Sequence, residues 1–236
     1  MTRAQLISAV ALRMDEITPS AGLSVTVDGS DNNPLATLID GIIDDGVLEL
    51  FTAAPYWRLP QTSFTAIENE ATNEIKVDDF DSRKIILLKV KNDFLRIGSV
   101  YCDDFQRPIT EVYPEQSAEG KRQYNKYLMG KEAKPVAVMS SGVWDSVISR
   151  EIKCFSLSAA TQVTKDSVTA TYVAKPATIV DDTDGVAPDN SVPVESVVPP
   201  MLIPALEWLL ASRTFGARGD AGHADICRQN AQNLLV

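Results

Sequence analysis

The spacing of apolar residues changes twice along the chain, and this change limits the possible folds more than any other feature. Toward both ends apolar residues recur every three or four positions, as on one face of an α-helix. Between residues 63 and 174 the spacing falls to two, which is typical of β-strands. The sequence therefore predicts an α+β fold: a helical bundle from N-terminal and C-terminal helices with an inserted antiparallel β-sheet or sandwich.

Residues 1–60 are predicted to contain two amphipathic helices. Thr2 and Gln5 have the spacing of a capping box, which starts a helix over 3–17. The second helix is expected over 34–53, with Asn33 as its cap. Its outer face is acidic, and we expect that face to be exposed and to bind no metal. The acidic residues are Asp40, Asp44, Asp45 and Glu49.

Residues 61–175 are predicted to form the β-rich domain. It contains a polar, helix-compatible insertion at 117–128. The runs that predict strands are 64–67, 74–77, 84–90, 94–102, 109–113, 136–139, 150–157 and 167–173.

Residues 176–200 differ abruptly in composition, because they contain five prolines and no lysine or arginine. Such a segment favours extended backbone and has few large apolar side chains to offset the entropy of ordering. We predict an extended arm that is ordered only in an assembly, where it crosses a neighbouring subunit. Two further helices, over 202–214 and 220–235, form the C-terminal helical tail at 201–236, and Asp220 is a plausible cap for the second.

The tail has more large apolar residues than one stripe of a lone surface helix accommodates. We therefore expect part of it to pack on its own subunit and part to bind another chain. Trp208 and Phe215 are the candidate aromatic anchors, although burial of both rings in the subunit core is an equally good interpretation. The predicted partner-binding residues are Met201, Leu202, Leu206, Trp208, Phe215, Leu234 and Leu235.

Composition excludes several classes of function. The chain has 22 lysines and arginines against 32 acidic residues, a net charge of −10, so a sequence-independent grip on DNA phosphates is disfavoured. No apolar run reaches the length of about 18 residues that a membrane helix needs. The three cysteines are far apart and form neither a disulfide framework nor a metal-binding pair, which fits a reducing compartment.

The sequence gives no sign of catalysis. His223 is the single histidine, and neither a nucleophile elbow, a phosphate-binding loop nor a zinc-protease motif is present. The acids at 181–185 do not have the spacing of a calcium loop, so turn chemistry is the better interpretation. The basic residues at 121–134 are interleaved with Tyr124 and Tyr127. Such a pattern can bind nucleic acid, but a solvent-exposed helical face is the better interpretation. We expect no enzyme activity, no catalytic residue, no cofactor and no metal.

The order of these elements supports a resemblance. An N-terminal helix pair, a β-rich middle and a C-terminal helical tail built around residues 204–215 (PALEWLLASRTF) resemble the head-to-tail connector proteins of tailed bacteriophages, also called adaptor or neck ring proteins. The similarity is greatest to the ring proteins of crAss-like phages. Residues 6–10 (LISAV) and 33–40 (NPLATLID) are similar to the same group.

The resemblance implies a structural virion protein that is made in the host cytoplasm and located in the neck between capsid and tail. Its partners would be further copies in a homo-oligomeric ring of about twelve subunits, the portal protein, and neighbouring neck or tail ring proteins. Genomic DNA would pass through the channel without sequence-specific binding. Two alternatives remain: a tail-terminator or tail-completion ring protein, and a metal-dependent cytoplasmic enzyme that uses a pair of the carboxylates.

Overall fold

The chain divides into two compact units. One contains residues 1–60 and 175–236, and the other contains residues 61–174. The structure, a computed structural model, describes residues 1–17, 34–64, 74–80, 83–125, 127–144, 147–158, 163–179 and 193–236. The predicted Asn33 cap lies outside these residues. Each unit is described by itself.

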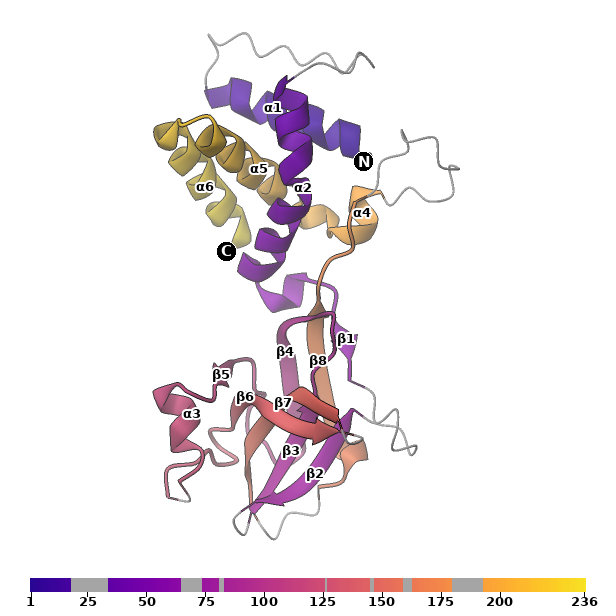
Figure 1. Ribbon diagram of the computed structural model, residues 1–236, viewed down its shortest axis with the longest axis vertical. Helices are drawn as coiled ribbons and strands as arrows, with labels where there is room; N and C mark the ends of the chain where they lie inside the picture. The colour runs from indigo at the N-terminus through magenta and orange to yellow at the C-terminus, as the bar shows by residue number, and fades with distance from the viewer. Residues whose placement is uncertain are drawn as a thin grey trace. The chain divides into compact units, whose positions relative to one another are not determined.

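The first unit is a helical bundle built from both ends of the chain (Figure 1). Helix α5 contacts α1, α2 and α6, so it is the central helix of the unit. Its side chains are buried on all sides, and the fully buried Leu206 and Leu210 lie in the same core as Ile39 and Leu50 of α2. The elements are α1 (Arg3–Ile17), α2 (Pro34–Ala53), η1 (Tyr56–Arg58), α4 (Val194–Val197), η5 (Pro200–Leu202), α5 (Ile203–Ala217) and α6 (Ala221–Leu235).

Local sequence patterns set the start of α1. The Gln5 side chain accepts a hydrogen bond from the Thr2 amide at 2.9 Å, and the Gln5 amide donates to the Thr2 hydroxyl at 3.2 Å. This reciprocal pair satisfies two amides that the first turn of a helix leaves unpaired, which confirms the predicted capping box.

The prediction of an extended arm at 176–200 is wrong for its described C-terminal end, whereas residues 176–179 form no regular element and are anchored only at Ile179. Val194, Val197 and Val198 are buried in the helical unit, and Val194 begins the short helix α4. Ile179 is 1% exposed, and its carbonyl accepts a hydrogen bond from Arg3. Burial of these four apolar side chains offsets the ordering entropy that the composition alone predicts to be prohibitive. Residues 180–192 lie outside the described part.

The second unit contains two sheets, with strand orders β1-β8-β4 and β2-β3-β7-β6-β5. Phe94 and Tyr172 of the first sheet share one core with Ile86 and Ile152 of the second, so the sheets pack face to face as a sandwich. The strands are β1 (Thr62–Ser63), β2 (Ile75–Phe80), β3 (Arg83–Lys89), β4 (Phe94–Cys102), β5 (Val112–Pro114), β6 (Val136–Trp144), β7 (Val147–Leu157) and β8 (Val168–Ala174).

The β unit differs from the prediction in several details. Strand β6 ends at Trp144 and β7 begins at Val147, so both extend beyond the predicted runs 136–139 and 150–157. The run at 109–113 gives only the short β5, which pairs with β6 in parallel rather than antiparallel orientation. The insertion expected at 117–128 contains one five-residue helix, α3 (Ala118–Arg122), which Ser117 caps by accepting from the Gly120 amide. The residues that follow α3 form turns rather than continuing the helix.

The three cysteines are all buried and free. Burial raises the pKa of each thiol, that of Cys227 to about 11, so the reactive thiolate is scarce at pH 8. We predict that the folded protein gives no rapid colour change with Ellman's reagent at pH 8, whereas three thiols react after unfolding in guanidinium chloride. A thiol that reacts rapidly in the folded chain would contradict the burial of that cysteine.

Candidate functional site

The structure separates the seven predicted partner-binding residues into two groups. Leu202, Leu206 and Phe215 are 0%, 0% and 4% exposed, so they belong to the core of the helical unit and not to a partner surface. This corrects the prediction for these three residues. The tail has apolar side chains on all faces because α5 has helices around it. Of the other four, Met201 and Leu234 are exposed, and Trp208 and Leu235 are half-buried.

Trp208 is engaged within its own subunit. The Arg13 guanidinium of α1 lies 5.3 Å from the centre of the Trp208 ring, and its Nε donates to the Glu207 carboxylate at 3.0 Å. A cation over an indole face is attracted by the ring quadrupole. The arrangement ties α1 to α5, so Trp208 offers only part of its ring to another chain.

The acidic face of α2 is also used within the helical unit. Arg3 of α1 forms ion pairs with Asp40 and Asp44, and Arg213 of α5 pairs with Glu49 at 2.6 Å. The carboxylates keep part of their exposure, but the face is not the unpaired acidic surface that the sequence of α2 suggests. The basic partners come from other helices, which explains why α2 forms without a basic residue of its own.

The start of α6 matches the predicted cap and assigns a role to the single histidine. The Asp220 carboxylate accepts from the His223 amide at 3.2 Å, and its second oxygen lies 2.6 Å from the His223 Nδ1. The side-chain bond with His223 lowers the pKa of the Asp220 carboxyl. The His223 ring also packs against Phe215, with centroids 5.4 Å apart. His223 therefore has a structural position at the turn between α5 and α6.

Replacement of Asp220 tests this cap. Asp220→Ala is expected to lower the melting temperature of the helical unit, because the first turn of α6 loses its side-chain acceptor. Asp220→Asn keeps a side-chain acceptor, so we expect this variant to lose much less stability than Asp220→Ala. Because the Asp220 pKa is lowered on folding, the stabilisation from its charge is present at neutral pH and is lost as the pH falls through that pKa. Thermal unfolding at pH 7 measures the melting temperatures, which should fall in the order wild type, Asp220→Asn, Asp220→Ala. An equal loss of stability in both variants would contradict the role of Asp220 as a cap.

The exposed Trp57 is a candidate contact residue that the sequence did not reveal. It is 67% exposed in η1, next to Arg58, whose guanidinium donates to the carbonyls of Leu234 and Val236 at the end of α6. The side chains of Leu234 and Val236 are exposed as well. Exposed tryptophan is enriched in protein interfaces. The run Tyr56-Trp57 directly after a helix-ending proline is the sequence feature that could have identified it.

The basic residues at 121–134, of which Lys121 and Arg122 lie in α3, do not surround a stacking platform of two tyrosines. The Tyr124 ring packs against Phe80 and Phe155, and its hydroxyl donates to Glu115 at 2.6 Å. Burial raises the pKa of the Tyr124 hydroxyl. Only Tyr127 is broadly exposed, at 79%. This favours the solvated-face interpretation for the described lysines and arginines; Lys126 lies outside the described residues.

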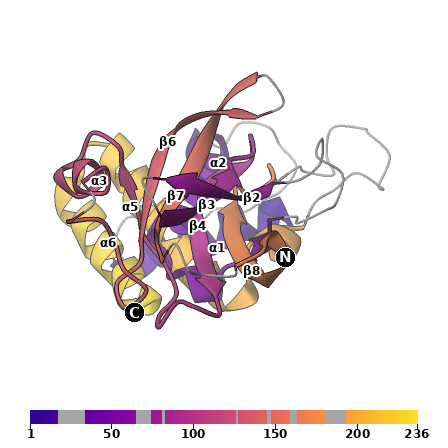
Figure 2. The same cartoon turned by 90° about the horizontal axis from the view of Figure 1, so that it is seen from below.

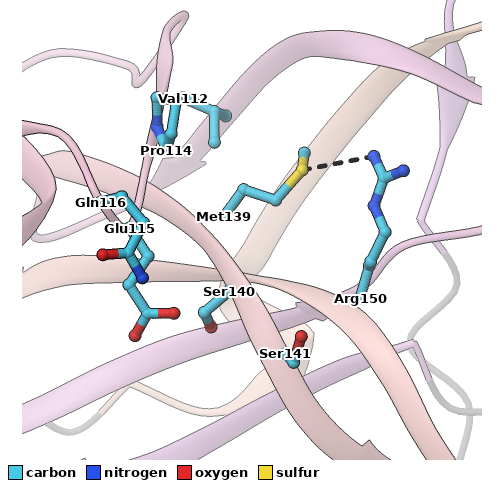
Figure 3. A pocket seen from close by; sticks show the side chains of 8 residues that line it. All are labelled: Val112, Pro114, Glu115, Gln116, Met139, Ser140, Ser141 and Arg150. Carbon is cyan, nitrogen blue, oxygen red and sulfur yellow. Dashed lines mark hydrogen bonds between the residues drawn. The ribbon is translucent and has the colours of Figure 1, made fainter.

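The β unit has an open hollow of about 400 Å³ beside β6 (Figure 3). Met139 forms part of its lining, and the Arg150 guanidinium donates to the Met139 sulfur at 3.3 Å. The remaining lining contains no arrangement of nucleophile, base and orienting group. The lining residues are Val112, Pro114, Glu115, Gln116, Met139, Ser140, Ser141 and Arg150.

The residues that the structure describes contain neither a cluster of metal ligands nor a helix that could span a membrane. No three histidine, cysteine or acidic side chains gather there closely enough to hold a metal ion. None of the helices described combines the length and apolar character needed to cross a bilayer. In comparisons with known proteins, neither a family model nor a curated protein matches the sequence.

Proposed function

We propose that this protein is a structural component of a tailed-bacteriophage virion, a subunit of the adaptor ring that joins the portal to the tail and surrounds the DNA channel. The observation that supports the proposal is which helices form the helical unit. Helices α1 and α2 from the start of the chain pack with α5 and α6 from its end, and the β unit is inserted between them. This is the order of elements on which the resemblance to neck ring proteins rests.

The exposed apolar side chains of the helical unit support a role in binding other proteins. Met201 at η5 and Trp57 in η1 are each about two-thirds exposed, at 68% and 67%, and Leu234 is 41% exposed. We assign these three residues, with the half-buried Trp208 and Leu235, to contacts with the portal or a neighbouring ring protein. The core residues Leu202, Leu206 and Phe215 are no longer part of this assignment.

The charge of the chain is compatible with a channel that does not hold DNA. A ring of copies that each carry a net charge of −10 repels phosphate and lets the duplex slide. Contacts to DNA are therefore expected to be weak and independent of sequence.

The decisive experiment measures assembly. The purified chain is examined by light scattering and negative-stain electron microscopy, alone and after mixing with the portal protein of the same phage. Closed rings that bind the portal are expected, with about twelve subunits by family resemblance. Rings that bind the tail tube and not the portal would identify a tail-terminator or tail-completion protein instead. A chain that remains monomeric at every concentration and binds neither the portal nor the tail tube would overturn the proposal.

A further inference from the structure

The hairpin of β6 and β7 extends beyond the strands on either side of it. The two strands pair continuously from Val136 opposite Phe155 to Trp144 opposite Val147. Strand β5 follows β6 only to Met139, and β3 follows β7 only to Glu151. Residues 140–144 and 147–150, which we call the ribbon, thus have only each other as strand partners among the described strands (Figure 2). At the base of the ribbon the Arg150 carbonyl also accepts a hydrogen bond from the Val90 amide, directly after β3.

The β6 side of the ribbon has an open backbone edge. The Met139 carbonyl accepts a hydrogen bond from the Glu115 amide, so alternate residues of β6 turn their backbone groups toward the β5 side. By this alternation Ser141 and Val143 direct N–H and C=O groups to the same side, where β5 has already ended. Such an edge is a template for an added strand. Its natural ligand is an extended segment of polypeptide.

One face of the ribbon is apolar and uncovered. Val143 and Ile148 lie directly opposite each other and are 68% and 80% exposed. They follow the alternation of Met139 and Ile152, whose side chains contact the core between the sheets. The core-facing side of this sheet therefore continues past the sandwich without a partner layer, where a strand from another chain could cover it.

Arg150 gives this face a positive charge. It lies opposite Ser141 and on the same side as Ile148. In the described part of the chain no carboxylate is within ion-pair distance of its guanidinium, which donates instead to the weak acceptor sulfur of Met139. A strand added at the edge of β6 would be stabilised by an acidic side chain within reach of Arg150.

The other edge of the same sheet supplies the complementary features. Among the strands that the structure describes, β2 pairs only with β3, and it carries Asp78 and Asp79 in exposed positions. Asp79 alternates with the buried Ile75 and so lies on the core-facing side, as Arg150 does. Its carboxylate is 81% exposed and meets Lys84 only at 3.4 Å. The chain thus has an apolar, basic edge and an acidic edge in one sheet.

Strand direction is compatible with pairing of these two edges. The order β2-β3-β7-β6 contains three successive antiparallel pairs, so β2 and β6 run in opposite directions. A second copy that continues the sheet places its β2 antiparallel to β6 of the first. The contact uses two different surfaces, and repetition of such a heterologous contact closes a ring when the rotation permits.

We propose that the ribbon of each subunit binds β2 of a neighbouring copy as an added antiparallel strand. In this contact Arg150 faces the partner subunit's Asp79, and the added strand covers Val143 and Ile148. The inference rests on the proposed function and deepens it, because it names the surfaces that join one ring subunit to the next.

A charge exchange tests the pairing. Arg150→Asp and Asp79→Arg are each expected to weaken self-association by about tenfold or more, because each places like charges across the contact. An equimolar mixture of the two variants is expected to associate as well as the wild-type chain, since each ribbon then meets an edge of opposite charge. Lys121→Asp, an equal change of charge on the exposed face of α3, is the matched control. Sedimentation velocity measures all four samples.

A second pair of variants tests the apolar face without changing charge. Val143→Ser with Ile148→Ser is expected to abolish association, whereas Leu128→Ser, at a side chain 59% exposed outside the ribbon, leaves it unchanged. Circular dichroism establishes that each variant is folded. Rings that persist in the charge variants or in the double serine variant would overturn the ribbon contact and leave the ring proposal standing. Association that follows the charge pattern but gives only open chains would support the ribbon contact and overturn the ring. A wild-type chain that never self-associates would overturn both.

Discussion

Truncation of Leu206 to alanine is expected to destabilise the helical unit by about 2–5 kcal/mol, while Met201→Ala changes its stability by less than about 0.5 kcal/mol. Leu206 is 0% exposed in the central helix α5 and lies beside Gly46 of α2, so its removal leaves a cavity in the core of the helical unit. Met201 is 68% exposed, and its side chain loses few contacts. Urea unfolding followed by circular dichroism at 222 nm measures both variants.

Phe215→Ala is a second test of whether a tail residue belongs to the core of the helical unit or to a partner surface. Phe215 is 4% exposed, and its loss is expected to cost about 3–5 kcal/mol. Truncation of either core residue should reduce assembly only to the extent that it reduces the folded fraction. If Leu206→Ala or Phe215→Ala abolished ring formation with unchanged stability, the residue would belong to the partner surface after all.

The helices could be predicted from sequence because their determinants are local. The Thr2 and Gln5 pair, Pro34 at the first turn and the Asp220 cap fix three helix starts. Strand β4, at 94–102, is also predicted at its observed bounds, because apolar residues such as Phe94, Ile97 and Val100 recur through the whole segment. In each case the pattern lies within the element itself.

The elements that sequence reasoning missed depend on distant residues. Val194, Val197 and Val198 are ordered because the helical unit offers them a core, which the composition of 176–200 does not reveal. The predicted strand at 136–139 ends too early, because β6 continues through Gly142 to Trp144, and at Gly142 a Cβ would collide with the Glu151 carboxylate. The parallel pairing of β5 is likewise a property of the sheet and not of its three residues.

The candidate contact residues likewise could not be assigned from local sequence alone. A count of large apolar residues in 201–215 indicates that the segment must be buried, but it cannot tell burial in the subunit from burial against a partner. The structure places Leu202, Leu206 and Phe215 in the core because α5 is surrounded by other helices. Val143 and Ile148 were missed because the ribbon's residues look like a turn between two shorter strands.

The base of the ribbon contains a buried ion pair whose disruption is the second large effect. Glu151 has a side chain 6% exposed and lies 3.3 Å from the Lys153 ammonium. Its carboxylate also accepts from the Trp144 indole at 3.1 Å. Lys153→Met is expected to cost about 2–3 kcal/mol, because it leaves a buried carboxylate without its counter-ion; the value is below that of a fully buried pair since Lys153 is 20% exposed.

Removal of both charges should be far less costly than removal of the lysine alone. Glu151→Gln keeps an oxygen for the Trp144 indole, so the double variant Glu151→Gln with Lys153→Met is expected to lie within about 1 kcal/mol of the wild type. Urea is the suitable denaturant, because it does not screen the pair as a salt does. Additive losses in the double variant would mean that the two charges are independently solvated. A coupling of about 2 kcal/mol would establish that the two charges stabilise each other in the buried base of the ribbon, where Glu151 also accepts from Trp144.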